Sequence, residues 1–392
     1  MNKEQLWGQV SAGEDIRFRT DGEGTSMWRD LLAFDPASSF ILDDIGNLPA
    51  LEDFLEMNGA KLCSGYFSYD LGMALQGVSS RHGRRIPLVV IHAYDKWVEY
   101  EQGQPHYVGI DPSEFGNTDS KSDPIPSFEF TPGISKAKYE ETIGRIQEYI
   151  RAGDFYQLNY TQQLLGKTHN QVSYAAMLKK HPAAYAMAME YSGMKIHSLS
   201  PELFLHYKTG TLTTEPIKGT RPRGTTQQED DAQRQELMSS EKEQAELFMI
   251  TDLLRNDLGK VSEIGSISLE AVKDMRKLPK VWHTYSRISG RLKKGLKPLD
   301  ALISMLPGGS ITGCPKKHAM EIIDEIEDSA RGIYTGSMGY FHPHGDFSFN
   351  IAIRTLVQQD GEISLGSGGG ITIDSMWAEE WNELMVKAST FL

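Results

Sequence analysis

FSFNIAIRTLVQQDGEISLGSGGGITID, residues 347–374, predicts two β-strands on either side of a turn, because apolar and β-branched residues run through both halves. Arg354 ends the strongly apolar first half, where a surface strand would carry an uncharged residue. A buried arginine usually has a carboxylate partner, and here that partner is either a side chain or a ligand. The stretch therefore predicts a sheet-based core with a positive charge at the end of one strand.

Short apolar runs fill the chain before residue 116 and predict half-buried strands; they include FILDDI, LCSGYFSYDLG and IPLVVIHAYDKWVEY. Residues 116–133 are polar, rich in Pro and Ser, and without periodicity, which is typical of a connector. We therefore expect an N-terminal part of strands and helices over residues 1–115 that packs on the core, a connector over residues 116–133, and the core itself over residues 134–392.

Helical periodicity appears several times in the second part of the chain. Apolar residues repeat at helical spacing from Tyr139 to Ile150. Further helices are expected over residues 241–256, stopped by Gly259, over the segment HAMEIIDEIE, and at the C-terminal end. Strands lie between these helices, and no internal repeat is visible. We predict an α+β fold with helices around a large sheet-based core.

Composition limits the partners that the protein can have. The 392 residues carry a formal net charge of -13, which argues against a generic nucleic-acid binder and points to no membrane partner. The two cysteines, Cys63 and Cys314, imply neither a disulfide framework nor a zinc site. The start, MNKEQLWGQV, lacks the pattern of a signal peptide, and no stretch is long and apolar enough to span a bilayer. We expect a cytoplasmic protein.

The segment TEPIKGTRPRG, residues 214–224, holds one lysine between rigid neighbours. Pro216 fixes its own φ angle and favours an extended backbone before it, while Gly219 permits a sharp bend. Lys218 is thereby held on the approach to a tight turn. A rigid lysine beside a glycine is either a nucleophile or an ordinary solvated cation, and with Arg221 and Arg223 nearby the segment leaves both interpretations open.

Two glycine-rich loops, GGSITGCPKK and GSGGGI, resemble nucleotide-binding loops only at first sight. The first has Cys314 and Pro315 where a P-loop needs Lys and then Ser or Thr, and the second ends in Ile371 where a dinucleotide fingerprint needs glycine. The bare amides of residues 368–370 are suited to binding an anion such as a carboxylate. Alternatively, the glycines only let backbone pass close to backbone.

Glutamates occur in two pairs at helical spacing. Glu243 and Glu246 share one helix face, and Glu380 and Glu383 share another near the C-terminus. Four converging carboxylates would suit Mg²⁺, which prefers hard oxygen ligands and keeps several waters. Glutamates at this spacing also commonly face solvent. Lys387, one turn after Glu383, fits either a helix salt bridge or an anion clamp.

Several motifs occur together in a fixed order between residue 139 and the C-terminus. They are GDFYQLNYTQ, SPELF, EPIKGTRPRG, QAELFMITDLLRNDLGKV, PGGSITGCPKKHAMEIIDEIE, RGIYTGSMGY, FNIAIRT and GSGGGITIDS. On these motifs the chain resembles the chorismate-utilising enzymes, and among them the aminodeoxychorismate synthase branch of the folate pathway, a relative of anthranilate synthase component I. The part before residue 139 matches only loosely, through GYFSYDLG.

This resemblance implies an α+β fold, with a two-sheet core and surrounding helices as in anthranilate synthase component I, that binds Mg²⁺ and chorismate. Glu246 and Glu383 match the metal ligands, with Glu243 and Glu380 as supporting carboxylates. Positions that match substrate contacts are Arg354, Tyr334, Gly368, Gly369 and Gly370 at the enolpyruvyl carboxylate, Lys387 at the ring carboxylate, and Thr312 and His283 beside the ring. Glu202, in SPELF, matches the general acid/base near the departing hydroxyl.

Two positions discriminate within the family. Gln157 stands where the water-adding isochorismate and salicylate synthases carry a lysine base, so water addition is disfavoured. Lys218 stands in PIKGT, which is similar to the aminodeoxychorismate synthases. Anthranilate synthases look like PIAGT at the same place. The resemblance therefore implies amination of chorismate at carbon 4 through a covalent Lys218 intermediate, with ammonia from a separate glutamine amidotransferase subunit. The alternatives are anthranilate synthase component I and a non-catalytic chorismate-binding protein.

Overall fold

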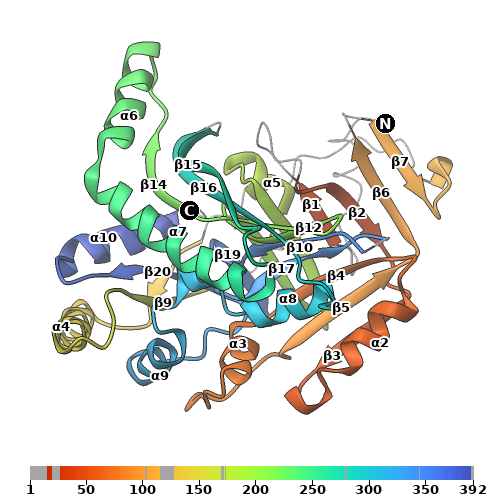
Figure 1. Cartoon of the computed structure of the whole chain (residues 1–392), viewed down its shortest axis with the longest axis horizontal. Coiled ribbons are helices and arrows are strands. Elements are labelled where there is room, and N and C mark those ends of the chain that lie inside the picture. Colours follow the sequence, from red (N-terminus) through yellow and green to blue (C-terminus); the bar gives the residue numbers. More distant parts are fainter. Residues whose placement is uncertain are drawn as a thin grey trace.

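Two ten-stranded antiparallel β-sheets form the centre of the molecule, and helices surround them (Figure 1). The computed structural model describes residues 16–19, 27–101, 104–114, 128–168, 172, 174–278, 280–343 and 345–389. Within these ranges the observed architecture is the α+β, two-sheet fold that the sequence predicted.

The first sheet joins strands from both ends of the chain. Its strands, in spatial order, are β7 (Gln104–Val108), β6 (Lys96–Glu101), β2 (Asp30–Phe34), β1 (Ile16–Arg19), β10 (Tyr185–Tyr191), β11 (Met194–Ser200), β19 (Thr355–Gln359), β20 (Glu362–Ile371), β9 (Leu158–Lys167) and β8 (Thr131–Pro132). Strand β20 pairs with β9 along its whole length, but with β19 only over Glu362–Leu365. Its glycine-rich second half therefore has one edge outside the β-ladder.

The second sheet is also built from both parts of the chain. Its order is β14 (Ile217–Pro222), β16 (Val281–Arg291), β13 (Thr211–Glu215), β12 (Leu203–Lys208), β18 (Phe347–Ile351), β17 (Ser337–Phe341), β4 (Leu62–Phe67), β5 (Val89–Tyr94) and β3 (Ser38–Leu42), and β15 (Ser268–Lys277) also pairs with β16. Because β4 pairs with β17 and β1 pairs with β10, strands from residues 1–115 continue both sheets. Most of the expected connector, residues 116–127, lies outside the described ranges.

The helices lie around the sheets, and α6 projects from the body of the molecule (Figure 1). They are α2 (Ala50–Met57), α3 (Tyr69–Leu75), α4 (Lys136–Ala152), α5 (Tyr174–Lys180), α6 (Gln227–Ser239), α7 (Glu241–Val261), α8 (Pro298–Met305), α9 (Lys316–Ile326) and α10 (Trp377–Ala388). Three short 3-10 turns are η1 (Ile45–Asn47), η2 (Pro112–Glu114) and η3 (Gly309–Ile311).

Local sequence explains where the longer helices begin and end. The Ser135 hydroxyl accepts a hydrogen bond from the Lys138 amide at the start of α4, and Gly153 ends it with a φ of 88°. The Ser240 side chain caps α7 in the same way. Gly259 does not stop α7, contrary to the prediction, because one glycine in a helix costs only about 1 kcal/mol and buried Leu258 and Val261 hold the last turn.

The strand predicted for the second half of residues 347–374 is confirmed: GSGGGI lies within β20, where the ladder to β9 keeps the glycines extended. The first half is not one strand, because the chain crosses between the sheets at Arg354, which divides it into β18 and β19. The charged segment after residue 226 is the helix α6, which begins with a capping box formed by Thr226 and Glu229. Its polar composition hid it from a search for an apolar face, since Asp230 and Leu237 are its only buried residues.

Candidate active site

Glu202 and Arg354 lie on two chain crossovers between the sheets, and these crossovers are adjacent. Glu202 connects β11 in the first sheet to β12 in the second, and Arg354 connects β18 in the second sheet to β19 in the first. The Ile351 amide donates to the Glu202 carbonyl at 3.1 Å, and the Leu199 amide donates to the Arg354 carbonyl at 2.8 Å. Two motifs 152 residues apart, SPELF and FNIAIRT, are thereby fixed side by side.

The Glu202 side chain is buried, with 6% of its surface exposed. Ser310 Oγ donates a hydrogen bond of 2.8 Å to Glu202 Oε1. Burial raises the pKa of Glu202 to about 7, although the Ser310 hydrogen bond and the charge of Lys218 both act to lower it. A carboxyl group that exchanges its proton near neutral pH is suited to general acid and base catalysis.

Lys218 lies on β14, the edge strand of the second sheet, and is partly buried. The pairing of β14 with β16 shifts register between Lys218 and Thr220, and Gly219 takes a φ of 76° there. This bulge re-aims the lysine side chain. Any larger residue than glycine would be strained at position 219, because an added Cβ would lie 2.7 Å from Leu237 Cδ1.

The charge of Lys218 acts on three carboxylates. It lowers the pKa of Glu202, of Glu246 on α7 and of Glu383 on α10, in each case against the opposing effect of burial. These groups come from one sheet crossover and two helices, so Lys218 lies where they converge. The sequence left open whether Lys218 is a solvated cation, and this position favours a site residue.

Glu246 has the environment expected of an unneutralised metal ligand. Burial raises its pKa, and so do the neighbouring charges of Glu243 and Glu383, while Lys218 and Lys242 lower it. Glu243 itself accepts a hydrogen bond from Arg221 Nη1 at 3.3 Å. Like charges that are held together in this way raise the energy of the empty site and favour a cation.

The C-terminal helix contributes the second pair of glutamates. Lys387 Nζ lies 2.6 Å from Glu383 Oε1 and donates to the Gly368 carbonyl at 2.8 Å. Glu380 accepts a hydrogen bond of 2.7 Å from Ser375 Oγ, and burial raises its pKa. For Glu383, burial acts to raise the pKa, but Lys387 and Lys218 bring it below the ordinary value. Lys387 is thus both a salt-bridge partner and a clamp on β20.

Gly369 brings the glycine-rich strand against these charges. A Cβ built on it would lie 3.5 Å from Glu380 Oε2, 3.6 Å from Lys387 Nζ and 3.7 Å from Glu383 Oε1. At Gly368 an added Cβ would lie 2.1 Å from the Tyr160 carbonyl oxygen. Of these two positions only Gly368 requires glycine, because it lets β9 approach; a Cβ at Gly369 would make ordinary contacts with the charged groups.

Mg²⁺ fits these residues through two carboxylates rather than four. Among the described residues, no group of three or more His, Cys, Asp or Glu side chains is placed to hold a metal ion. The charge of Glu383 acts on Glu246, whereas Glu243 and Glu380 are engaged by Arg221 and Ser375; Glu383 is itself paired with Lys387 at 2.6 Å, so a metal ion would share Glu383 with that lysine. Mg²⁺ is commonly held by one or two carboxylates, with water and substrate oxygens completing its octahedron.

Arg354 has no acidic partner among the described residues. No described carboxylate lies within ion-pair distance of its guanidinium group, and burial alone lowers its pKa. Its backbone adopts a φ of 47°, which is uncommon for a residue other than glycine. Of the two partners that the sequence allowed for Arg354, a protein carboxylate and a ligand, this arrangement favours the ligand.

His283 lies close to Arg354, on β16, and is 2% exposed. Its Nδ1 atom is 2.9 Å from Thr220 Oγ1, and its buried Nε2 atom has no hydrogen-bond partner in the part of the chain that the structure describes. Burial and the charge of Arg354 lower the pKa of His283 to about 3, so the ring is neutral at physiological pH. A neutral ring with such a nitrogen atom is suited to a hydrogen bond with a substrate oxygen, not to an ionic contact.

One wall of the candidate site is formed by Gln157, Thr312 and Gly370. Gln157 is 7% exposed, and a Cβ on Gly370 would lie 1.7 Å from the Gln157 Nε2 atom. The buried Oε1 atom of Gln157 has no hydrogen-bond partner among the described residues. The Thr312 hydroxyl donates to the carbonyls of Gly308 and Gly309 at 3.2 and 3.3 Å. Thr312 therefore stabilises its own loop first, and its role as a ring contact stays a prediction.

Tyr334 packs on the glycine-rich strand beside these residues. A Cβ on Gly366 would lie 2.1 Å from Tyr334 Cγ, so the ring covers that glycine directly. Burial raises the pKa of the Tyr334 hydroxyl, and the charge of Arg331 acts against that rise. The hydroxyl is therefore a neutral donor at physiological pH, as a carboxylate contact requires.

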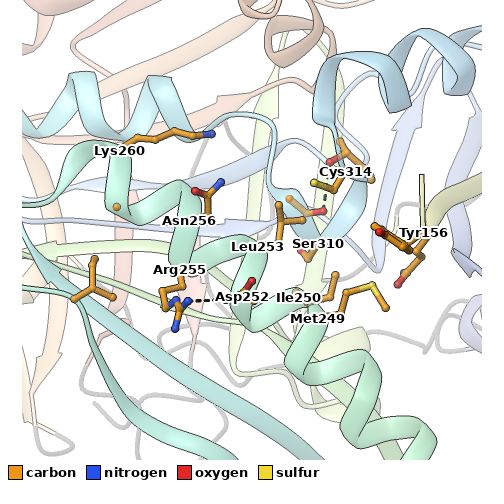
Figure 2. Close-up of a pocket in the computed structure, with 16 residues that line it drawn as sticks. Tyr156, Met249, Ile250, Asp252, Leu253, Arg255, Asn256, Lys260, Ser310 and Cys314 are labelled. Atoms are coloured by element: carbon orange, nitrogen blue, oxygen red, sulfur yellow. Dashed lines mark hydrogen bonds and ion pairs between the residues drawn. The ribbon is translucent and has the colours of Figure 1, made fainter. Parts of the chain in front are cut away.

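A cavity of about 920 Å³ opens beside this wall (Figure 2). Its lining includes Gln157, Ser310 and Thr312 together with residues of α7, and Figure 2 shows Tyr156 and Ser310 on the side away from Arg255. Lys218, Glu246, Glu383 and Arg354 do not line it. Because these charged groups identify the binding site better than volume does, we interpret the cavity as an approach to the site from the Glu202 side.

Ser310 was missed by sequence reasoning, although it lies in the segment GGSITGCPKK. The segment matches a family motif in which Thr312 was the predicted contact, and a serine among glycines carries no signal of its own. The contact with Glu202 joins positions 108 residues apart and depends on the fold. The charged pair at the end of the same segment, Lys316 and Asp257 at 2.6 Å, was missed for the same reason.

Comparison with known proteins agrees with this geometry. The model of the family described as chorismate binding enzyme matches residues 17–392. The chain belongs to the chorismate-binding enzyme family. A curated member, anthranilate synthase component 1 1 from Haloarcula marismortui, is 34% identical over 389 residues, which cover 87% of this chain and 79% of that protein. Aminodeoxychorismate synthase component 1 from Bacillus subtilis is 37% identical over 273 residues, covering 69% of this chain and 58% of that protein.

Solved structures of chorismate-binding enzymes share the fold. Anthranilate synthase component I from Streptococcus pneumoniae matches with a TM-score of 0.82 and 24% sequence identity, covering 100% of this chain and 97% of that one. The putative isochorismate synthase DhbC from Bacillus anthracis matches with a TM-score of 0.76 and 20% identity. The fold is thus shared by enzymes named for different reactions. None of the described helices is both long and apolar enough to cross a membrane.

Proposed function

We propose that this chorismate-binding enzyme aminates chorismate at ring carbon 4, giving 4-amino-4-deoxychorismate, with Lys218 as a covalent catalyst. The observation that carries the proposal is the position of Lys218, whose charge acts on Glu202, Glu246 and Glu383 together. A lysine whose charge is felt by all three carboxylates supports a role beside the proposed general acid and the proposed metal ligands. Anthranilate synthases look like PIAGT at this place, with an alanine instead of the lysine, and alanine has no nucleophilic group.

In the first step the Lys218 amine, in its neutral form, forms a bond to ring carbon 2. The two ring double bonds shift, the bond from carbon 4 to the hydroxyl oxygen breaks, and its electron pair stays on that oxygen. Glu202 donates its proton to the same oxygen, so water leaves and Glu202 becomes a carboxylate. A pKa of about 7 allows Glu202 to hold this proton near neutral pH.

In the second step ammonia forms a bond to carbon 4 from the vacated position. The double bonds return, and the bond between carbon 2 and the lysine nitrogen breaks, which releases Lys218 as the neutral amine. The Glu202 carboxylate takes the proton that the new ammonium group loses, so both residues are restored. While lysine occupies carbon 2, ammonia is directed to carbon 4, which fixes the position of amination.

The charged residues divide the work of binding the two substrate carboxylates. Glu246 and Glu383 would hold Mg²⁺, which would neutralise the ring carboxylate and orient the ring. Arg354, without an acid of its own, would bind the enolpyruvyl carboxylate, with Tyr334 and the β20 amides beside it. Gln157 has no basic group, so water in the site is not activated as a nucleophile.

Ammonia supply is part of the proposal. We infer that a separate glutamine amidotransferase subunit provides ammonia, because neither cysteine of the chain lies in the GxCxGxQ context of a glutaminase nucleophile. The cavity whose lining includes Ser310 offers a small nucleophile a way to the Glu202 side. Ammonium salts should replace the partner in the test tube.

Anthranilate synthase component I is the second candidate, favoured by the identity of 34% to the Haloarcula protein. Incubation of the chain with chorismate, Mg²⁺ and ammonium separates the two activities. Aminodeoxychorismate, which an added lyase converts to p-aminobenzoate, supports the proposal. Anthranilate fluorescence without any lyase contradicts it. A chain that binds chorismate without Mg²⁺ and makes no product would be a non-catalytic chorismate-binding protein.

A further inference from the structure

The Glu202 carboxyl group has one side-chain hydrogen bond within the described residues, and Ser310 donates it. The bond joins Ser310 Oγ to Glu202 Oε1 at 2.8 Å, and both side chains are buried, with 8% and 6% of their surfaces exposed. The second oxygen, Oε2, receives no hydrogen bond from the protein in these ranges. The two oxygens of one acid therefore have different environments.

The loop that carries Ser310 is fastened from both sides. Lys316 Nζ donates to the carbonyls of Met305 and Pro307 at 3.2 and 3.0 Å, and it pairs with buried Asp257 on α7 at 2.6 Å. Gly309 lies so close to α7 that an added Cβ would be 2.8 Å from Leu253 Cδ2. Ser310 therefore has a fixed position relative to α7, the helix that carries Glu246.

We propose that Ser310 is a positioning residue for Glu202: its hydroxyl occupies Oε1, so that Oε2 carries the proton to and from the substrate. A hydroxyl that donates to one carboxyl oxygen takes up one of its lone pairs and favours the other oxygen for the acid proton. The proton then lies on the oxygen that faces the departing hydroxyl in every turnover. The inference rests on the proposed role of Glu202 as the acid and base of the amination.

The same contact adjusts the acid strength of Glu202. A hydrogen bond to the ionised carboxylate stabilises it and opposes the effect of burial. The described charged group that also acts on Glu202 is Lys218, from β14. Removal of the Ser310 hydroxyl should therefore raise the pKa of Glu202 while the Lys218 charge stays in place.

The test follows Glu202 directly by infrared spectroscopy. The protonated-carboxyl band that is lost in Glu202→Gln is titrated in the wild-type chain and in Ser310→Ala, Ser310→Cys and Ser310→Thr. Cysteine keeps the volume but is a weak donor, and threonine keeps the hydroxyl. Ser304→Ala is the control, since its hydroxyl donates to the Ala301 carbonyl at 3.0 Å, away from any acid.

We expect the titration midpoint to rise by roughly one pH unit in Ser310→Ala and Ser310→Cys, with kcat about tenfold lower and KM for chorismate nearly unchanged. Ser310→Thr and Ser304→Ala should keep the wild-type midpoint. An unchanged midpoint in Ser310→Cys, or in a folded Ser310→Ala, overturns the proposal even if kcat falls. The titration needs no substrate, so a product other than aminodeoxychorismate would contradict the proposed function without affecting this result.

Discussion

Lys218 lies close enough to Glu202 for its charge to lower the pKa of that buried carboxyl group. One comes from an edge strand of the second sheet and the other from a crossover between the sheets. In the proposed reaction the amine attacks one ring carbon while the acid protonates the group that leaves another. In that proposal the nucleophile and the acid would act at two ends of one conjugated system.

Replacement of the nucleophile tests the first of these roles. Lys218→Ala should reduce aminodeoxychorismate formation by at least about 10³-fold, because the carbon 2 bond cannot form. The rate is measured with ammonium and an added lyase. Lys208→Ala, at the exposed end of β12, is the matched control and should keep full activity.

Replacement of the unpaired arginine tests substrate binding. Arg354→Gln should raise KM for chorismate about 10- to 100-fold, because no carboxylate of the described residues pairs with the guanidinium group and its proposed partner is the substrate carboxylate. Arg145→Gln is the control, since Arg145 on α4 pairs with Glu325 at 2.5 Å and does not line the cavity. Equal KM values in the two variants would contradict the assignment.

The metal proposal concerns two carboxylates. Glu246→Gln and Glu383→Gln should each raise the Mg²⁺ concentration for half-maximal activity by about 10²-fold. Glu379→Gln, on the exposed side of α10, should leave it unchanged. Activity is followed against Mg²⁺ concentration, and full activity in a chelator would rule out a metal-dependent reaction.

The strand before Lys218 depends on a buried ion network. Glu215 pairs with Arg276 at 2.7 Å and with Arg287 at 2.6 Å, and it also binds Tyr185. Glu215→Ala leaves Arg276 buried without its acid and should lower the free energy of unfolding by about 3–5 kcal/mol in urea denaturation. Glu263→Ala removes only an exposed contact to Arg291 at 3.7 Å and should cost less than about 1 kcal/mol.

His283 should make stability depend on pH. Its pKa is lowered from the ordinary value of 6.5 to about 3 in the folded chain, so the unfolded chain binds the proton more readily. Stability from this residue is complete above pH 6.5 and is lost as pH falls towards 3. The free energy of unfolding of the wild type should therefore fall relative to His283→Asn between about pH 7 and pH 4. A constant difference would show that His283 does not titrate.

Much of the fold was predictable from local pattern. The apolar spacing from Tyr139 and the cap at Ser135 mark α4, and the alternating residues before and after Asp360 mark β19 and β20. It was not predictable that both parts of the chain would contribute strands to both sheets. The pairing of β4 with β17, for example, joins residues far apart in sequence. The sequence of one antiparallel strand does not identify the strand with which it pairs.

The candidate site was predictable only through motifs. The spacing predicted that Glu243 and Glu246 share one helix face. It did not predict that Glu243 would bind Arg221 and leave Glu246 for the site. The unpaired state of Arg354 and the contact of Ser310 with Glu202 depend on which crossovers become neighbours. Such relations follow from topology, so they appear only once the chain is folded.

The most direct test is intact-mass analysis of the protein incubated with chorismate and Mg²⁺ without ammonia. The covalent account predicts an adduct with the mass of chorismate less one water, located at Lys218 by peptide mapping, which ammonium then removes. An unmodified chain that nevertheless makes aminodeoxychorismate when ammonium is added, at the same rate in Lys218→Ala as in the wild type, would contradict the account.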